Sequence, residues 1–595
     1  MTTAVTAINK TKIVATVGGP RGGPGDSLVD PAGTEVTSPL SHGELLTWFI
    51  EAGVDILRIN MSFADHSKPY GANEAAYLRW LAANKGGVAR RVGVLGDLPG
   101  PKTRLGKKLR GQEKLALRRG EELVLGFGTA PADASVLVNG QPFSAQVRGI
   151  DGYRDIGAYV QNTPDAVFSL ADGKLRLENL TDDGNGRIRG AVSKDFEIEG
   201  GKGLTITGAD LRVAAFQARD KRALRFLLQH ADELLAYVAV SFVQTPEEIL
   251  DAKWVIHSWW TQAGPRKRLR PPGVIAKIET RSAVNNISSI LDVADGVMVA
   301  RGDLGEQLAS EEIPRIQKDL IRLCNARGKP VITATQMLDS MEKNPKPTRA
   351  EATDVFNAVL EGTDAVMLSG ETSKGQYPVQ AIRMMKNIAA EATKFYFLTQ
   401  DGRTPNRRTP RELLDDSKGI VGDNTARLKN KAAEATTERM RSPSLKRKWT
   451  ADLLWDKVVR SEKQTTTDQI CAAACELSEE GDYRAIVSPT TSGRTVHMIS
   501  RFRPAKLVIG AAHDARTFRK LLLSFGVFPV EIGQVHNLVG DALKAAVAES
   551  QKEGLLKPGS DDDLVEVVAT SGTPLKKPGS TNLVQILRVH PLFRP

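Results

Sequence analysis

The chain has 595 residues, of which 41% are apolar and 25% charged, as in folded globular proteins. Its length predicts three or four domains rather than one. No run approaches the ~18 uninterrupted apolar residues of a membrane-spanning helix, and the first residues lack the pattern of a secretory signal. Three cysteines are too few for a disulfide framework, so we expect a cytoplasmic protein with no membrane partner. Cys471 and Cys475, four residues apart without a histidine, indicate buried thiols rather than a metal pair.

The net charge of +11 raises the question of a polyanionic partner. Residues 401–463 alone carry 16 Lys and Arg against 10 Asp and Glu. This segment has no aromatic residues at its most basic positions, whereas single-stranded nucleic-acid sites combine cations with stacking rings. A solvated surface insertion is therefore the preferred interpretation over a nucleic-acid-binding segment.

Eight short apolar or β-branched runs recur along the first two thirds of the chain, most of them followed by a helical pattern. Such alternation indicates a parallel sheet covered by helices. Eight strands favour a closed (β/α)8 barrel, the TIM-barrel fold of the α/β class, over an open sheet. The expected strands are Ile13–Val17, Ile56–Asn60, Val92–Asp97, Tyr237–Ser241, Val274–Ile278, Val297–Arg301, Val331–Ala334 and Ala365–Ser369.

About 140 residues separate the third and fourth of these strands. Short alternating segments with Gly-rich turns fill that interval and predict a small all-β domain, an inserted β-barrel lid over the barrel mouth. Its expected strands are Glu122–Leu125, Ser135–Val138, Ala166–Leu170, Leu175–Leu177 and Arg187–Val192.

A second α/β pattern begins near Gln464 and indicates a C-terminal α/β domain. Its expected strands are Ala485–Val487, Leu507–Ile509, Val527–Val530, Leu564–Val568 and Val584–Val589. The predicted domain organisation is 1–101 for the first part of the barrel, 102–205 for the lid, 206–397 for the second part of the barrel, 398–463 for a basic, polar insertion and 464–595 for the C-terminal domain.

Six of the expected barrel strands end in polar residues, and the carboxyl ends of barrel strands are where such folds place their chemistry. Six polar ends on one rim are hard to explain as salt bridges alone, because each buried charge needs compensation. We therefore predict a site there. These ends are Arg58–Ser62, Asp97, Lys277–Glu279, Arg301–Asp303, Thr335–Gln336 and Ser369–Glu371.

Glu279 and Asp303 follow consecutive strands, so their carboxylates are expected to meet. Two carboxylates without histidine or cysteine suit a hard divalent ion such as Mg²⁺. The alternative is a pair of simple ion pairs, Glu279 with Lys277 and Asp303 with Arg301. An ion pair is the preferred interpretation for either carboxylate considered alone. Two carboxylates expected at the same place favour the metal site.

Lys277 lies two residues before Glu279 and therefore points to the same side of its strand. A cation beside a metal is tolerated when an anion bridges them, and a phosphate or a developing enolate would be such an anion. Arg58 offers a second, bidentate phosphate contact. Gly302 stands at an expected helix start, where its N–H suits a substrate carboxylate.

At this point the motifs identify a resemblance. TKIVATVG (11–18), RINMS (58–62), AKIET (276–280), VARGDLG (299–305), KPVITATQML (329–338), PTRAEATDV (347–355) and MLSGET (367–372) resemble the pyruvate kinase family in letters, order and spacing. The resemblance covers almost the whole chain. It implies a glycolytic phosphotransferase that converts phosphoenolpyruvate and ADP to pyruvate and ATP, with a barrel, a lid after strand three and a regulatory C-terminal domain.

The resemblance also implies a role for each matching residue. Lys277 would neutralise the phosphoryl group in flight and the enolate, Arg58 would bind the phosphate, and Thr335 would join the route of the proton to the enolate. The substrate's carboxylate end would lie against Gly302, Asp303 and Thr335. Glu279 and Asp303 would hold Mg²⁺, with Mn²⁺ as an alternative. Nucleotide contacts would come from Arg104, Lys202 and Asn60, with Asp172 nearby, and supporting positions would be Arg301, Ser369 and Glu371.

A monovalent site in the family is formed by residues that match Asn60, Ser62, Asp97 and the carbonyl of Leu98. Lys102 stands where K⁺-dependent members carry glutamate. Since an ammonium group can supply the charge of the monovalent ion, the hypothesis is that catalysis requires Mg²⁺ but not K⁺.

The loop of Thr490, Thr491, Ser492, Gly493, Arg494 and Thr495 resembles the family's effector loop. Its hydroxyls and N–H groups suit an anion, which predicts a sugar-phosphate effector. The alternative is an ordinary strand-to-helix turn with Thr and Ser caps. The family also implies a homotetramer.

Two other functions remain open at this stage. A Mg²⁺-dependent lyase or aldolase that forms a pyruvate enolate would need neither Lys202 and Arg104 nor the lid. A catalytically reduced homologue with a binding or regulatory role would not need the complete set of Lys277, Glu279, Asp303 and Thr335. The sequence therefore favours the active enzyme.

Overall fold

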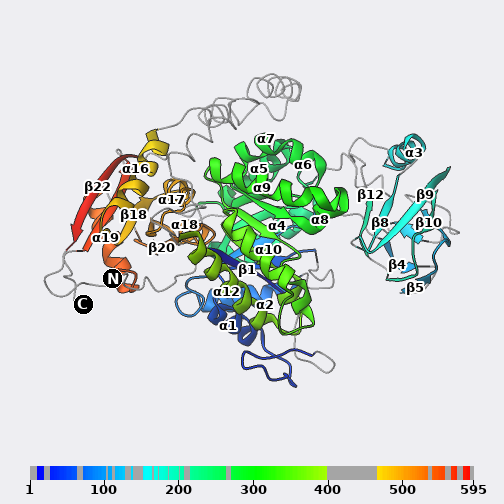
Figure 1. Ribbon diagram of the computed structural model, residues 1–595, viewed down its shortest axis with the longest axis horizontal. Coiled ribbons are helices and arrows are strands. Elements are labelled where there is room, and N and C mark those ends of the chain that lie inside the picture. Colours follow the sequence, from blue (N-terminus) through cyan, green and yellow to red (C-terminus); the bar gives the residue numbers. More distant parts are fainter. Residues whose placement is uncertain are drawn as a thin grey trace.

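The protein consists of a central barrel with one smaller domain on each side (Figure 1). The first of these domains, drawn in cyan, and the C-terminal one, drawn in orange and red, lie at opposite ends of the molecule. None of the described helices combines the length and apolarity that a membrane crossing requires. The computed structural model describes residues 10–18, 27–62, 71–101, 105–109, 114–126, 136–138, 152–163, 166–171, 173–184, 187–199, 202–206, 215–262, 270–397, 466–533, 539–556, 565–572 and 581–589.

Eight parallel strands close into the predicted barrel, in the order β1-β17-β16-β15-β14-β13-β3-β2. Each expected strand is present, with bounds that differ by at most a few residues from the prediction. The strands are β1 (Lys12–Val17), β2 (Ile56–Asn60), β3 (Gly93–Asp97), β13 (Leu235–Val240), β14 (Gly273–Ile278), β15 (Gly296–Ala300), β16 (Val331–Ala334) and β17 (Ala365–Leu368).

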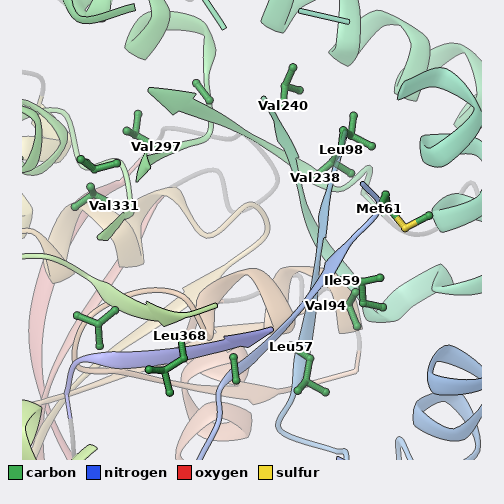
Figure 2. Packing of buried hydrophobic residues seen from close by; sticks show 14 of the residues in the cluster. Leu57, Ile59, Met61, Val94, Leu98, Val238, Val240, Val297, Val331 and Leu368 are labelled. Carbon is green, nitrogen blue, oxygen red and sulfur yellow. The ribbon is translucent and has the colours of Figure 1, made fainter. Parts of the chain in front are cut away.

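Successive side chains of each strand alternate between the barrel interior and the helices outside it, as the period of two requires. On β2, Ile56 belongs to the inner cluster, whereas Leu57 and Ile59 pack outward. Figure 2 shows this outer layer, in which branched aliphatic side chains from neighbouring strands lie together. The same alternation turns Arg58 inward at the end of β2.

Helices cover the barrel, and local sequence signals set several of their ends. Ser41 caps α1 through a capping box with Glu44, and Gly53 ends that helix at φ 103°, a value that glycine adopts without strain. Thr348 and Glu351 form the same box at the start of α10. The helices are α1 (His42–Ala52), α2 (Ala72–Ala83), α4 (Ala218–His230), α5 (Pro246–Gln262), α6 (Arg281–Asn285), α7 (Ile287–Val293), α8 (Arg301–Gln307), α9 (Ile313–Ala326), α10 (Arg349–Leu360), α11 (Gly370–Ser373) and α12 (Pro378–Phe397).

The strands between β3 and β13 form a seven-stranded sheet, in the order β12-β8-β9-β10-β6-β7-β4, and a two-stranded sheet of β11 and β5. The expectation of a purely β domain is wrong in one respect, because helix α3 (Gly152–Asn162) packs here through Ile156 and Val160. The strands are β4 (Leu105–Leu109), β5 (Lys114–Leu117), β6 (Glu122–Gly126), β7 (Val136–Val138), β8 (Phe168–Leu170), β9 (Leu175–Gly184), β10 (Arg187–Val192), β11 (Phe196–Glu199) and β12 (Leu204–Ile206).

The C-terminal domain is a five-stranded sheet in the order β20-β19-β18-β21-β22, parallel except for the last pair. Cys471 and Cys475 are buried thiols on α16, so the prediction of buried thiols is confirmed. Burial raises the pKa of Cys471 to about 12. The elements are α16 (Thr466–Glu480), β18 (Ala485–Thr490), α17 (Arg494–Ser500), β19 (Leu507–Ala512), α18 (Ala515–Leu521), β20 (Val527–Glu531), α19 (Val539–Lys552), β21 (Val565–Gly572) and β22 (Thr581–Val589).

The C-terminal domain docks on the amino end of the barrel. Phe518 and Leu522 belong to the same buried cluster as the inward side chains of the barrel strands, so α18 closes this end. Arg516 is fully buried, donates to the carbonyls of Arg270 at 2.5 Å and of Asp232, and stacks on Trp260.

Three more buried arginines hold the same junction. Arg519 donates to the carbonyl of Val92 at 2.6 Å, where β3 begins. Arg503 pairs with Asp364 at 3.0 Å, directly before β17. Arg501 donates to the carbonyl of Ala326 at 2.7 Å at the end of α9. The opposite, carboxyl end of the barrel is therefore the end left for chemistry.

Candidate active site at the carboxyl rim of the barrel

A chain of buried charges crosses the carboxyl rim from β2 to β14. Arg58 donates from Nε at 2.8 Å and from Nη2 at 2.7 Å to the same carboxylate oxygen of Asp97, which ends β3. The other Asp97 oxygen lies 3.3 Å from the ammonium of Lys277 on β14. Asp97 is only 1% exposed. Its buried carboxylate therefore fixes the positions of both Arg58 and Lys277.

Lys277 has two further partners. Its Nζ lies 2.9 Å from Oε1 of Glu279 and donates to the hydroxyl of Ser241 at 2.8 Å. The Ser241 hydroxyl in turn donates to the carbonyl of Leu98 at 2.8 Å. The pairing of Lys277 with Glu279 that the sequence offered as an alternative is thus present, as part of a larger network.

Burial and charge shift both pKa values in this pair. Burial lowers the pKa of Lys277, but the carboxylates of Asp97, Glu279 and Asp303 outweigh it and raise the pKa above its usual value. Burial raises the pKa of Glu279, Lys277 opposes this, and the negative charge of Asp303 adds to it. The charge of Asp303 thus acts on both groups.

The donor set fits a hard divalent ion. Arg58 and Lys277 bring two positive charges and Asp97, Glu279 and Asp303 bring three negative ones, so these five side chains carry one excess negative charge when all are ionised. Oε1 of Glu279 is buried and accepts no aligned hydrogen bond, despite its closeness to Lys277. An oxygen of this kind is suited to coordination. Among the described residues, no group of three or more His, Cys, Asp and Glu is placed so that it could hold a metal ion. An ion bound by two carboxylates would therefore take its remaining ligands from water or substrate.

Asp303 and Arg301, which the ion-pair alternative joined, both lie on the first turn of α8. The guanidinium of Arg301 binds Asp354 of α10 at 2.7 and 2.8 Å. The partner of Arg301 on this side is therefore a residue that the alternative did not include.

The residues after β16 turn sharply towards α8. Thr335 and Gln336 both adopt the left-handed conformation, at φ 66° and 53°. The Thr335 hydroxyl accepts a hydrogen bond from the N–H of Gly302 at 2.7 Å and donates to the carbonyl of Ala334 at 2.6 Å. The fold thus brings Thr335, Gly302 and Asp303 together, as the sequence led us to expect.

The three supporting positions surround this turn. Arg301 donates to the carbonyl of Thr335 at 2.7 Å. The carboxylate of Glu371 accepts the N–H of Leu338 at 3.0 Å and that of Ser369 at 2.7 Å, and burial raises its pKa. The Ser369 hydroxyl is buried without a hydrogen-bond partner. Arg301 and Glu371 therefore hold the two sides of one turn.

The residues expected to bind a monovalent ion lie side by side but already have partners. Asn60 pairs in register with Asp97 across β2 and β3. The Asn60 side-chain oxygen accepts the N–H of Ser62 at 3.1 Å. The Leu98 carbonyl takes the Ser241 hydroxyl, and both Asp97 oxygens face cations. Lys102 lies outside the described residues.

The expected nucleotide contacts are only partly described. Lys202 lies two residues before β12, which contacts α8, the helix that carries Asp303. Its side chain is 43% exposed, and its ammonium pairs with Glu199 at 3.2 Å. Arg104, Asp172 and the segment 398–463 lie outside the described residues.

The expected effector loop joins β18 to α17 in the C-terminal domain. The Thr490 hydroxyl accepts the N–H of Gly493 at 2.9 Å, and Gly493 adopts φ 82°. The hydroxyls of Thr495 and Thr581 lie 2.6 Å apart. The neighbours Thr491, Ser492 and Arg494 lie on the same turn. These contacts are those of a capped turn, and the anion interpretation stays a prediction.

Two residues of the rim were missed from the sequence. Ser241 directly follows β13 and links Lys277 to Leu98. The Thr16 hydroxyl accepts from Nη1 of Arg58 at 2.8 Å and donates to the carbonyl of Leu368 at 2.8 Å. Both are uncharged residues near the carboxyl end of a strand. Each becomes part of the site because it lies in register with a cation on another strand. A systematic search for polar residues at all eight strand ends would have included them.

Comparison with known proteins follows the division into domains. The family model described as "Pyruvate kinase, barrel domain" matches residues 8–382, and "Pyruvate kinase, alpha/beta domain" matches residues 468–587.

Curated relatives named pyruvate kinase match along most of the chain. That of Geobacillus stearothermophilus is 33% identical over 97% of this chain and 80% of its own length. That of Clostridium acetobutylicum is 30% identical over 91% of this chain and 96% of its own length. The crystal structure of a pyruvate kinase from Cryptosporidium parvum superposes with a TM-score of 0.69, at 25% identity, and covers 97% of this chain and 96% of that one.

Proposed function

Because the chain belongs to the pyruvate kinase family, we propose that its carboxyl rim transfers a phosphoryl group from phosphoenolpyruvate to ADP. The observation that carries the proposal is the buried network of Arg58, Asp97, Lys277 and Glu279. Phosphoryl transfer needs mainly positioning and charge stabilisation from the protein. Fixed cations at the mouth of a barrel supply both.

Lys277 has the central role in this proposal. Its ammonium is held by three partners and has a raised pKa, so it stays charged across the neutral range. A fixed positive charge lowers the barrier when negative charge develops on the transferring phosphoryl group and on the enolate oxygen. Arg58 binds the phosphate from the side of β2, with its guanidinium already oriented by Asp97 and Thr16.

Glu279 and Asp303 would hold Mg²⁺, with Mn²⁺ as an alternative. The ion would supply charge neutralisation between substrate oxygens. Without it the rim has an excess negative charge, which repels a trianionic substrate, whereas a divalent ion reverses the sign. The proposal therefore predicts that a divalent cation is essential for tight substrate binding.

Thr335 and Gly302 would orient the other end of the substrate. The N–H of Gly302, at the start of α8, faces the Thr335 hydroxyl and suits a carboxylate. That hydroxyl would also hold a proton on the path to the methylene carbon of the enolate. Protonation at that carbon converts enolpyruvate to pyruvate and draws the reaction towards ATP.

The monovalent ion is expected to be dispensable. Asn60, Asp97 and Leu98 already have hydrogen-bond or ion-pair partners within the protein. The positive charge that K⁺ would bring would come from Lys102. A sugar-phosphate effector at the 490–495 loop and a homotetramer complete the proposal.

A direct assay tests the proposal. Purified enzyme with ADP, phosphoenolpyruvate and Mg²⁺ should form equal amounts of ATP and pyruvate, with no pyruvate when the divalent ion is chelated. Replacing K⁺ by tetramethylammonium should leave most of the activity. Absence of ATP formation would refute phosphoryl transfer, whereas loss of activity only without K⁺ would refute the role of Lys102 alone.

A further inference from the structure

A strained turn stands beside the proposed site. Thr335 and Gln336 are consecutive residues with positive φ, a conformation that is a true outlier for a β-branched residue such as threonine. Each such residue costs on the order of 1–3 kcal/mol and persists only when its surroundings enforce it. Side chains that contact this turn must therefore hold its two residues in the left-handed conformation.

One guanidinium holds both strained residues. Arg301 donates from Nε at 3.2 Å and from Nη2 at 2.7 Å to the carbonyl of Thr335, and from Nη2 at 2.9 Å to that of Gln336. The two carbonyls thus converge on one cation while both residues are in the left-handed conformation. Arg301 is 8% exposed, so water does not compete freely for these bonds.

Asp354 fixes this guanidinium from the other side. Its two oxygens accept from Nη1 of Arg301 at 2.8 and 2.7 Å, and the side-chain oxygen of Gln317 lies 3.2 Å from the same nitrogen. Asp354 lies on α10, whose start is fixed by the capping box of Thr348 and Glu351. A rigid helix thus orients the arginine, and the arginine orients the turn.

We propose that Asp354 is a positioning residue for the reaction and acts, through Arg301, on the hydroxyl of Thr335. This rests on the proposed role of Thr335 in delivering the proton. The consequence of the clamp is visible at that hydroxyl, which is held 2.7 Å from the N–H of Gly302. Without the charge on Asp354 the guanidinium keeps only its neutral acceptors Gln317, Thr335 and Gln336 among the contacts described above, so its orientation is less firmly fixed and the turn can relax to a less strained conformation.

The test is the variant Asp354→Asn, which keeps the size of the side chain and removes its charge. We expect kcat to fall by between about 10-fold and about 100-fold, the range caused by small displacements of a reacting group. The exchange of pyruvate methyl protons with D₂O, followed by ¹H NMR with Mg²⁺ and ATP, should slow by a similar factor, because this exchange reports the proton step alone. Asp319→Asn is the matched control, since it removes the charge from an exposed pair with Arg315 and should change neither rate.

A double variant separates positioning from a merely structural role. If Asp354 acts through Thr335, then Asp354→Asn combined with Thr335→Val should be no slower than Thr335→Val alone. If the rate losses of the two single variants multiply in the double variant, the two residues act independently and the proposal is overturned. If Thr335→Val alone leaves proton exchange unchanged, the proposed role of Thr335 fails instead.

A second variant covers the case in which Asp354→Asn folds poorly. Asp354→Glu keeps the charge but lengthens the side chain, which should displace the guanidinium and lower kcat and methyl exchange together. Normal kcat and normal exchange in this variant, together with a loss of thermal stability alone in Asp354→Asn, would show that the pair only anchors α8 to α10.

Discussion

The two ends of the barrel both contain buried cations but use them differently. At the carboxyl end, Arg58 and Lys277 face side-chain carboxylates, which outnumber them. At the amino end, Arg516 and Arg519 face mainly main-chain carbonyls of the barrel. The first arrangement leaves negative charge that a bound ligand can offset, whereas in the second the cations are held by fixed main-chain groups of the protein.

The difference shows how the partners of a buried cation indicate its role. Carbonyl groups at strand and helix ends are fixed hydrogen-bond acceptors, and an arginine that caps them joins two domains without leaving ligand-binding capacity. Burial raises the pKa of Glu279, and repulsion from Asp303 adds to this. Carboxyl groups with shifted pKa values of this kind are typical of active sites, where a bound ligand offsets their charge.

The largest expected effect comes from the carboxyl end. Lys277→Met removes the fixed charge and should lower kcat by about 10³-fold or more, because one lost charge-stabilising donor already costs about 10²–10³. Steady-state kinetics of pyruvate formation measure this. Thermal stability should fall as well, because the buried carboxylate of Glu279 loses the cation that offsets its charge. A near-normal kcat in Lys277→Met would contradict the claim that the buried cations of the carboxyl end, unlike those of the amino end, serve the reaction.

The matching change at the amino end should affect stability and leave chemistry intact. Arg516→Met leaves the carbonyls of Arg270 and Asp232 without their donor and removes the stacking on Trp260. Unsatisfied buried acceptors of this kind cost about 2–4 kcal/mol together. We expect a lower apparent midpoint in differential scanning calorimetry and an unchanged kcat at low temperature. A large loss of kcat with an unchanged midpoint would contradict the division of roles.

A smaller effect concerns pH at the same junction. Burial, with neighbouring cations adding to it, lowers the pKa of Lys329 and of Lys520 from 10.5 to about 8. Between pH 8 and 10.5 the unfolded chain therefore binds more protons on these residues than the folded protein does. Stability consequently rises with pH in this window through these two groups.

Comparison with a variant isolates that contribution. The difference in thermal midpoint between the wild type and Lys329→Met should shift in favour of the wild type as pH rises from 8 to 10.5. The ammonium of Lys329 donates to the carbonyl of Ala294 at 2.6 Å, so the substitution removes a hydrogen bond at every pH. A difference that stays constant across the window would show that Lys329 does not titrate there.

The sequence predicted the carboxyl end far better than the amino end. Near-continuous apolar runs gave the barrel strands, and their charged ends gave Arg58, Lys277 and Glu279. Arg516 and Arg519, by contrast, look like surface residues of a short helix in sequence, because only docking against another domain buries them. Helix α3 was missed because the segment around it has strand-like composition.

Ser241 and Asp354 show a second limit of sequence. The position of Ser241 at a strand end and of Asp354 within the 347–355 motif makes them candidates, but each gains its role from a partner on another element, Lys277 and Arg301. Register across the sheet and packing between α8 and α10 create these contacts. Local spacing in the sequence does not identify the partners.

The most direct test is calorimetric titration of the enzyme with phosphoenolpyruvate, with Mg²⁺ present and with the divalent ion chelated. The excess negative charge of the rim predicts tight binding only when Mg²⁺ is present, and Glu279→Gln should weaken the Mg²⁺-dependent component. Equally tight binding under both conditions would contradict the account, because it would show that the carboxylates of Glu279 and Asp303 are already neutralised by the protein.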